Sequence, residues 1–77
     1  MAVENRKALR LLRYEKELTQ TDMARLLNVE RVTYAAVERG VRDGSYKLWE
    51  RLQQVFNIPD AEMWGLMKKG GGADASG

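Results

Sequence analysis

Residues 18–40 read LTQTDMARLLNVERVTYAAVERG, and this stretch decides the fold class. Thr19 is a residue type that caps helix N-termini well, and Asp22 follows three residues later as a shortened form of the capping-box acid. The apolar positions that come next at helical spacing are Met23, Ala24, Leu26 and Leu27. The pattern predicts a first short helix over residues 20–27.

A second short helix is predicted over residues 31–39, immediately after a tight turn. Asn28 tolerates the left-handed conformation that a sharp turn requires, and Gly40 suits the position just after a helix end. Two helices joined by about three residues must cross steeply, which favours a small residue such as Ala24 at the crossing. The spacing is that of a helix-turn-helix unit. The alternative is a generic helical hairpin in a small bundle.

Three further helices are predicted from apolar periodicity, over roughly 4–16, 46–56 and 60–69. No strand-like alternation and no internal repeat is visible, so the predicted class is all-α, a compact five-helix domain. We expect this domain to span residues 1–69. Residues 70–77, GGGADASG, lack side chains able to bury themselves and are predicted to be a flexible tail.

Composition limits the function. The chain has 77 residues with no cysteine and no histidine, which removes thiol nucleophiles, the usual general base and the commonest metal ligands. The carboxylates are scattered among basic residues, so we expect no enzyme, no cofactor, no metal and no small-molecule ligand. No apolar run has the length of a membrane span or a signal peptide, and the expected location is cytoplasmic, without membrane association.

The charge distribution favours a polyanionic partner. The formal net charge is +2 and the pI near 9.2. Residues 1–16 carry +3, from Arg6, Lys7, Arg10, Arg13 and Lys16 against two glutamates, and residues 31–51 carry +2. Either cluster alone is explained equally by solvated helix surfaces.

From Leu9 to Met63, about 55 residues, the chain resembles the lambda repressor and Cro-type helix-turn-helix family of bacterial and phage regulators, also called the xenobiotic-response-element family. The matching segments are Leu9, Leu12 and Arg13; LTQTDMA at 18–24; Asn28 and Val29; VERG at 37–40; and Leu52, Phe56 and Ile58. The resemblance implies a five-helix bundle in which the second motif helix reads the major groove. The implied function is a sequence-specific regulator of double-stranded DNA, expected to be a repressor, that binds an inverted-repeat operator as a homodimer.

Roles for individual residues follow from the resemblance. Gln20 would contact a phosphate or a neighbouring base, and Arg39 and Arg42 would neutralise phosphates. Arg13 and Glu38 match a family pair that forms a salt bridge between the first helix and the recognition helix, whereas a solvated Glu38 is the alternative.

A helical wheel at 100° per residue divides the recognition helix into two faces. Tyr34 and Val37 face the bundle, and the outer face is predicted to carry Arg31, Val32, Ala35, Ala36 and Arg39. Arg31 could make a bidentate contact to guanine, and Thr33 could reach a base or a phosphate. Val32 and Ala36 could contact thymine methyl groups. Specificity then rests on few contacts and on DNA shape.

The last helix carries the candidates for a dimer surface, which are Met63, Trp64 and Met67. These side chains could equally close the core over Trp49 and Phe56, and the sequence leaves both interpretations open.

Four positions depart from the family pattern. Glu30 stands where Ser or Thr is usual, Glu17 where Gly is common, Gly44 where Pro is common and Gln53 where Ala is frequent. Glu30 would be repelled by nearby phosphates. With the apolar outer face of the recognition helix, it supports a second hypothesis, in which the fold is a protein docking module with weak, non-specific DNA binding.

Overall fold

A computed structural model describes residues 5–69 and forms five helices: α1 (Lys7–Glu15), α2 (Gln20–Leu27), α3 (Arg31–Glu38), α4 (Tyr46–Phe56) and α5 (Asp60–Met67). The described residues contain no strand, and the predicted all-α, five-helix class is confirmed. The bounds of α2 and α4 equal the predicted ranges, and those of the other three helices differ by at most three residues. Residues 1–4 and 70–77, including the predicted tail and the expected start of the first helix, lie outside the described residues.

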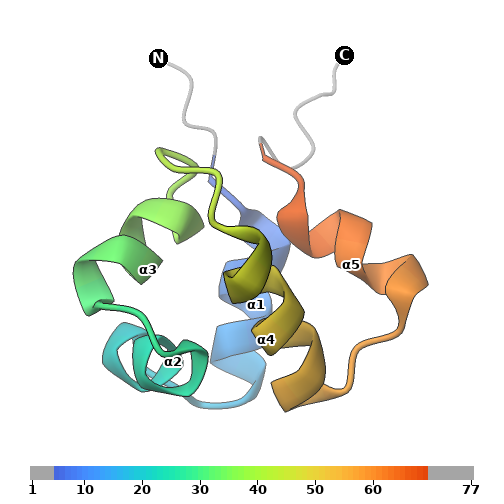
Figure 1. Ribbon diagram of the computed structural model, residues 1–77, viewed down its shortest axis with the longest axis horizontal. Helices are drawn as coiled ribbons and strands as arrows, with labels where there is room; N and C mark the ends of the chain where they lie inside the picture. The colour runs from blue at the N-terminus through green and yellow to red at the C-terminus, as the bar shows by residue number, and fades with distance from the viewer. Residues whose placement is uncertain (1–4, 70–77) are drawn as a thin grey trace.

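The helices wrap around one core. α2 packs against α3 and α4, while α1 packs against α3 and α5, and α4 also contacts α5. Figure 1 shows α2 and α3 side by side at one end of the bundle and α5 at the other. The segment between α3 and α4, residues 39–45, lies at the top of the view in Figure 1, on the same side of the bundle as the start of α1 and the end of α5. We call this segment the 39–45 loop.

The core is built from apolar side chains of the first four helices. Its fully buried members with the largest side chains are Tyr34, Leu9, Met23, Leu52 and Val37. Ala24 is 3% exposed at the crossing of α2 and α3, where its small side chain permits the close approach that the sequence predicts. α5 contributes no buried residue and covers the core with half-buried side chains such as Met63 and Leu66.

The start of α2 and the turn after it both have the predicted local structure. The Thr19 hydroxyl accepts a hydrogen bond from the Asp22 amide at 3.0 Å, and the Asp22 carboxylate accepts from the Thr19 amide at 2.9 Å. This reciprocal capping box fixes the start of α2. Asn28 has φ 60°, in the left-handed region, and the Val29 amide then donates to the Ala24 carbonyl at 2.9 Å. These contacts set the direction in which α3 leaves the turn.

Three apolar assignments from the sequence are wrong. Ala35 was predicted on the outer face of α3, but it is 8% exposed, because it lies at the margin of the inner face where a methyl group still reaches the bundle. In residues 46–56, the helical spacing of Tyr46, Trp49, Leu52, Val55 and Phe56 predicts a single inner face. Tyr46 is instead 79% exposed; Leu48, at 3%, takes the buried position. Val55, predicted on the same inner face, stays partly exposed.

Glu17 occupies a backbone conformation that favours glycine. Its φ is 58°, which costs a residue with a Cβ atom about 1–2 kcal/mol relative to glycine. Replacement of Glu17 by glycine is therefore expected to stabilise the fold by about 0.5–1 kcal/mol after the greater entropy of the unfolded glycine chain is counted. Urea denaturation measures the change. The same replacement at Glu50, an exposed position in the middle of α4, is the control and should destabilise, so equal effects at the two sites would contradict the interpretation.

Within residues 5–69, no helix has the length and apolar character needed to cross a membrane.

Candidate functional site

The outer face of α3 is accessible along its length. Val32 is 65% exposed, Arg31 at the first turn and Arg39 just beyond the last turn are exposed, and Thr33 and Ala36 are half-buried between them. The side chains between Arg31 and Arg39 are therefore short, and a guanidinium group lies near each end of the face. Four of its residues are those predicted to contact bases: Arg31, Val32, Thr33 and Ala36.

Gln20, at the start of α2, contacts α3 through its side chain. Its Nε2 donates to Glu38 Oε1 at 3.1 Å, and its Oε1 accepts a long hydrogen bond from Arg31 Nη1 at 3.4 Å. The side-chain amide thus links an exposed arginine to a buried carboxylate. The sequence had placed Gln20 at a phosphate or a neighbouring base; in this geometry its side chain is already engaged. The capping box uses the amides of Thr19 and Asp22, which leaves those of Gln20 and Thr21 at the start of α2 for a phosphate.

Glu38 is the centre of a buried polar cluster. Arg13 binds its carboxylate in a bidentate manner, with Nε to Oε2 at 2.8 Å and Nη2 to Oε1 at 3.1 Å. The Tyr34 hydroxyl donates to Oε2 at 2.7 Å, and Glu38 is only 4% exposed. The Arg13–Glu38 ion pair named from the sequence is present, and it joins α1 to α3 below the outer face.

The pKa values in this cluster are shifted in a consistent way. Burial raises the pKa of Glu38, but the hydrogen bonds from Arg13, Tyr34 and Gln20 outweigh it and hold the pKa below its usual value. The hydrogen bond to Glu38 raises the pKa of Arg13, and burial raises the pKa of Tyr34. Glu38 is therefore a carboxylate at neutral pH, fully used by its neighbours, and its charge is not presented to the α3 surface.

The 39–45 loop carries the two arginines predicted to contact phosphates. Arg39 and Arg42 are both exposed. The loop backbone is folded inward, since the amides of Val41 and Arg42 donate to the Ala36 carbonyl at 2.9 and 3.2 Å. Gly44 has φ 84°, in the left-handed region. The two guanidinium groups thus extend the basic surface from the end of α3 into the loop.

The buried position of Arg6 removes it from the basic surface that the sequence predicted for residues 1–16. It was counted with the basic surface of residues 1–16, yet it is 3% exposed, and Arg13 is 9% exposed. Arg6 donates to four backbone carbonyls, those of Val37, Arg42, Asp43 and Met67. Sequence reasoning missed it because backbone acceptors from distant parts of the chain leave no residue pattern.

The three candidate dimer residues of α5 differ in how far their side chains are exposed. Trp64 is 70% exposed and Met67 37% exposed, whereas Met63 is half-buried against the core. Met63 and Met67 also line a shallow apolar groove, together with Tyr46 and Trp49 of α4. The three residues therefore divide into one that packs on the core and two that extend outward.

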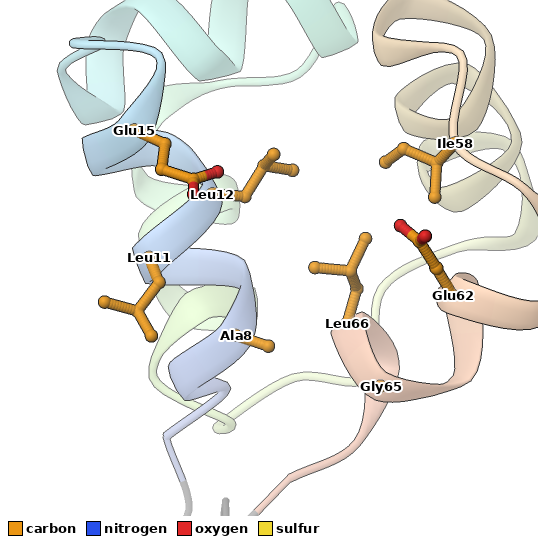
Figure 2. A pocket seen from close by; sticks show the side chains of 8 residues that line it. All are labelled: Ala8, Leu11, Leu12, Glu15, Ile58, Glu62, Gly65 and Leu66. Carbon is orange, nitrogen blue, oxygen red and sulfur yellow. The ribbon is translucent and has the colours of Figure 1, made fainter.

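A second groove lies between α1 and α5, and none of its lining residues belongs to α3. Figure 2 shows Leu12, Ile58 and Leu66 pointing toward one another across it. Its remaining lining residues are Ala8, Leu11, Glu15, Glu62 and Gly65, and its volume is about 280 Å³. Two carboxylates at an apolar groove do not suit a polyanion, so this side of the molecule is not part of the basic surface.

Comparison with known proteins adds one finding. A family model described as a helix-turn-helix domain matches residues 7–64, which include α1 to α4 and the first half of α5. No curated protein matches the chain, and no solved structure matches it. The matched range contains the α2–turn–α3 unit, the outer face of α3 and the 39–45 loop.

Proposed function

Because the chain belongs to the helix-turn-helix domain family, and is thus a DNA-binding regulator, we propose that it recognises a specific double-stranded operator by inserting α3 into the major groove. The observation that carries the proposal is the accessible outer face of α3, with Arg31 and Arg39 at its ends and small or apolar side chains between them. A helix fits the major groove closely only where its outer side chains are short, and this face meets that condition.

Base recognition is assigned to Arg31, Val32, Thr33 and Ala36. Arg31 suits the paired acceptors of guanine, and its bond to Gln20 Oε1 holds the guanidinium at the start of α3. Val32 and Ala36 lie one helical turn apart, so their methyl groups can contact thymine methyls on neighbouring base pairs. Few hydrogen bonds read the bases, and groove shape supplies the remaining specificity.

Backbone contacts are assigned to Gln20, Arg39 and Arg42. The exposed amides at the start of α2 suit a phosphate, and the Gln20 side chain can share its amide between that phosphate and Glu38. Arg39 and Arg42 supply positive charge from the other end of α3. Phosphates bound at both ends of the helix would fix its position in the groove.

A homodimer on an inverted repeat completes the proposal. Trp64 and Met67 of α5 offer exposed apolar surface for self-association, and a second copy would place the two α3 helices about one duplex turn apart. An operator held by two copies would exclude other proteins from the same DNA, which is the basis for proposing a repressor.

Selection from a random pool of duplexes of about 30 base pairs tests the proposal. Enrichment of inverted half-sites, centred about one helical turn apart, is the expected result. A single enriched half-site would remove the dimer from the proposal. A pool that stays random at moderate salt would contradict sequence-specific binding and would favour the docking module, with Val32 as the first position to test for a protein partner.

Arg42→Ala is expected to weaken binding to every DNA sequence and to reduce the slope of log K against log salt by about 0.9, the value for one phosphate contact. Arg31→Ala should instead relax preference at one base position, at a cost of about 1–3 kcal/mol. Fluorescence anisotropy at several salt concentrations measures both effects.

Arg25→Ala is the matched control for these variants. Arg25 is an exposed arginine in the last turn of α2, away from the start of that helix. Its loss should leave the salt slope unchanged. Equal slopes for the wild-type, Arg42→Ala and Arg25→Ala chains would contradict the phosphate assignment.

A further inference from the structure

We propose that Arg6 is a positioning residue for DNA contact: it fixes the 39–45 loop, and with it Arg42, to the end of α5. The inference rests on the proposed function, because it assigns Arg6 to the backbone contacts of that same surface. Arg6 itself does not face the DNA, since it is 3% exposed.

One guanidinium group joins three segments that are distant in the chain. Nη1 donates to the Val37 carbonyl at 2.6 Å and to the Arg42 carbonyl at 2.8 Å, and Nη2 donates to the Asp43 carbonyl at 3.3 Å. Nε donates to the Met67 carbonyl at 2.7 Å. The guanidinium of Arg6 therefore forms hydrogen bonds with the last turn of α3, with the 39–45 loop and with the last residue of α5.

The backbone of Arg6 and a neighbouring ring hold the guanidinium in place. The Arg6 amide donates to the Glu38 carbonyl at 2.8 Å, and the guanidinium carbon lies 5.2 Å from the centre of the Trp49 ring. Trp49 Nε1 in turn donates to the Asp43 carbonyl at 3.0 Å. Because Asp43 O is bound from two sides, the loop has little freedom at this point.

These contacts determine where Arg42 can reach. Its carbonyl is bound by Arg6 and its amide by the Ala36 carbonyl, so both polar groups of its backbone are held toward the protein. The exposed side chain is left to extend outward. A phosphate contact gains from such fixing, because less conformational entropy is lost on binding.

The chemistry requires an arginine. Four of its five N–H groups are used on four carbonyls spread around one plane, and a lysine ammonium presents its three donors from a single nitrogen. Burial lowers the pKa of Arg6, and the Asp43 carboxylate opposes this effect. Lys69 adds a second link between the end of α5 and the loop, with Nζ 3.3 Å from Asp43 Oδ1.

The same contacts hold the end of α5 to the 39–45 loop. Trp64 and Met67 form the proposed dimer surface, and the carbonyl of Met67 is bound by Arg6. Displacement of the end of α5 would pull on the same guanidinium that holds Arg42.

The test compares Arg6→Lys with the control Gln53→Ala. Gln53 of α4 also donates to a backbone carbonyl, that of Ile58, but this contact lies near the start of α5, at the opposite end of that helix from Met67. Both variants are assayed at a temperature where circular dichroism shows them fully folded. Arg6→Lys should lower DNA affinity about tenfold and reduce the salt slope by about 0.9, while Gln53→Ala changes neither.

A double variant decides whether Arg6 acts through Arg42. Adding Arg42→Ala to Arg6→Lys should have little further effect on DNA affinity, because the phosphate contact is already lost. Additive effects, or a wild-type salt slope in Arg6→Lys, would overturn the proposal.

Hydrogen exchange provides a readout that does not depend on DNA. In Arg6→Lys, the amides of Val41 and Arg42 should exchange at least tenfold faster, with the amides in the middle of α4 unchanged. If this variant does not fold, the wild-type chain supplies the answer: Arg6 Nε–H and those two amides should open with the same free energy. Loop amides that open tenfold more often than Arg6 Nε–H would refute the link. If the wild-type chain binds no DNA, the proposed function fails, and exchange still decides whether Arg6 fixes the loop.

Discussion

Glu38→Ala is expected to destabilise the protein by about 3–5 kcal/mol, the range for removing one partner of a buried ion pair. The carboxylate accepts hydrogen bonds from Arg13, Tyr34 and Gln20, and its loss leaves a buried guanidinium without its counter-ion. Urea denaturation at pH 7 measures the change. A loss below about 1 kcal/mol would show that water replaces the carboxylate at little cost.

The same cluster predicts how stability depends on pH. Because the folded state holds the pKa of Glu38 below its unfolded value, the stabilisation is complete above the unfolded pKa of about 4.3 and is lost as the pH falls through the lower folded pKa. Glu38→Gln should remove this part of the acid-induced loss. Glu50→Gln, at an exposed position of α4, is the control, and this variant should lose as much stability on acidification as the wild-type chain does.

Gly44→Ala is expected to cost about 2–3 kcal/mol. Gly44 has φ 84°, which costs an alanine about 1–2 kcal/mol. A Cβ atom would lie 2.8 Å from Trp49 Nε1, so the ring must shift and weaken its hydrogen bond to the Asp43 carbonyl, which contributes about 1 kcal/mol. Thermal denaturation and Trp fluorescence together report the loss of stability and the movement of the ring.

Gly65→Ala is the matched control for this prediction. Gly65 lies within α5, and a Cβ atom there would meet nothing within 4 Å. Alanine should therefore stabilise the helix by about 1 kcal/mol, opposite in sign to Gly44→Ala. Two substitutions of the same kind with the same sign of effect would contradict the geometric explanation.

The elements of the fold could be predicted because their signals are local. Thr19, Asp22 and Asn28 act within four residues of their own position, and the structure contains the capping box and the left-handed turn that they indicate. It was harder to predict which side chains of each helix face the core. Ala35 and Tyr46 were misplaced because a small residue fits either side of a helix and a large aromatic residue is not buried merely by its spacing.

The candidate site could be predicted only where side chains meet solvent. The exposure of Arg31 and Val32 follows from periodicity, and Arg42 was named from the family resemblance; their proposed DNA contacts stay predictions. Arg6 could not be found in this way. Its partners are carbonyl groups of residues up to 61 positions away, and carbonyls carry no information about residue type. Long-range bonds between side chain and backbone become visible only when the chain is folded.

α5 differs from the other helices in burying no residue fully. Besides the half-buried Met63 and Leu66, hydrogen bonds hold it at its two ends, from Gln53 to Asp60 and from Arg6 to Met67. Substitutions on its outer side, at Trp64 for example, therefore cost little free energy of folding. The outer side of α5 can therefore vary in sequence while the α2–turn–α3 unit, which does not depend on those side chains, keeps its fold.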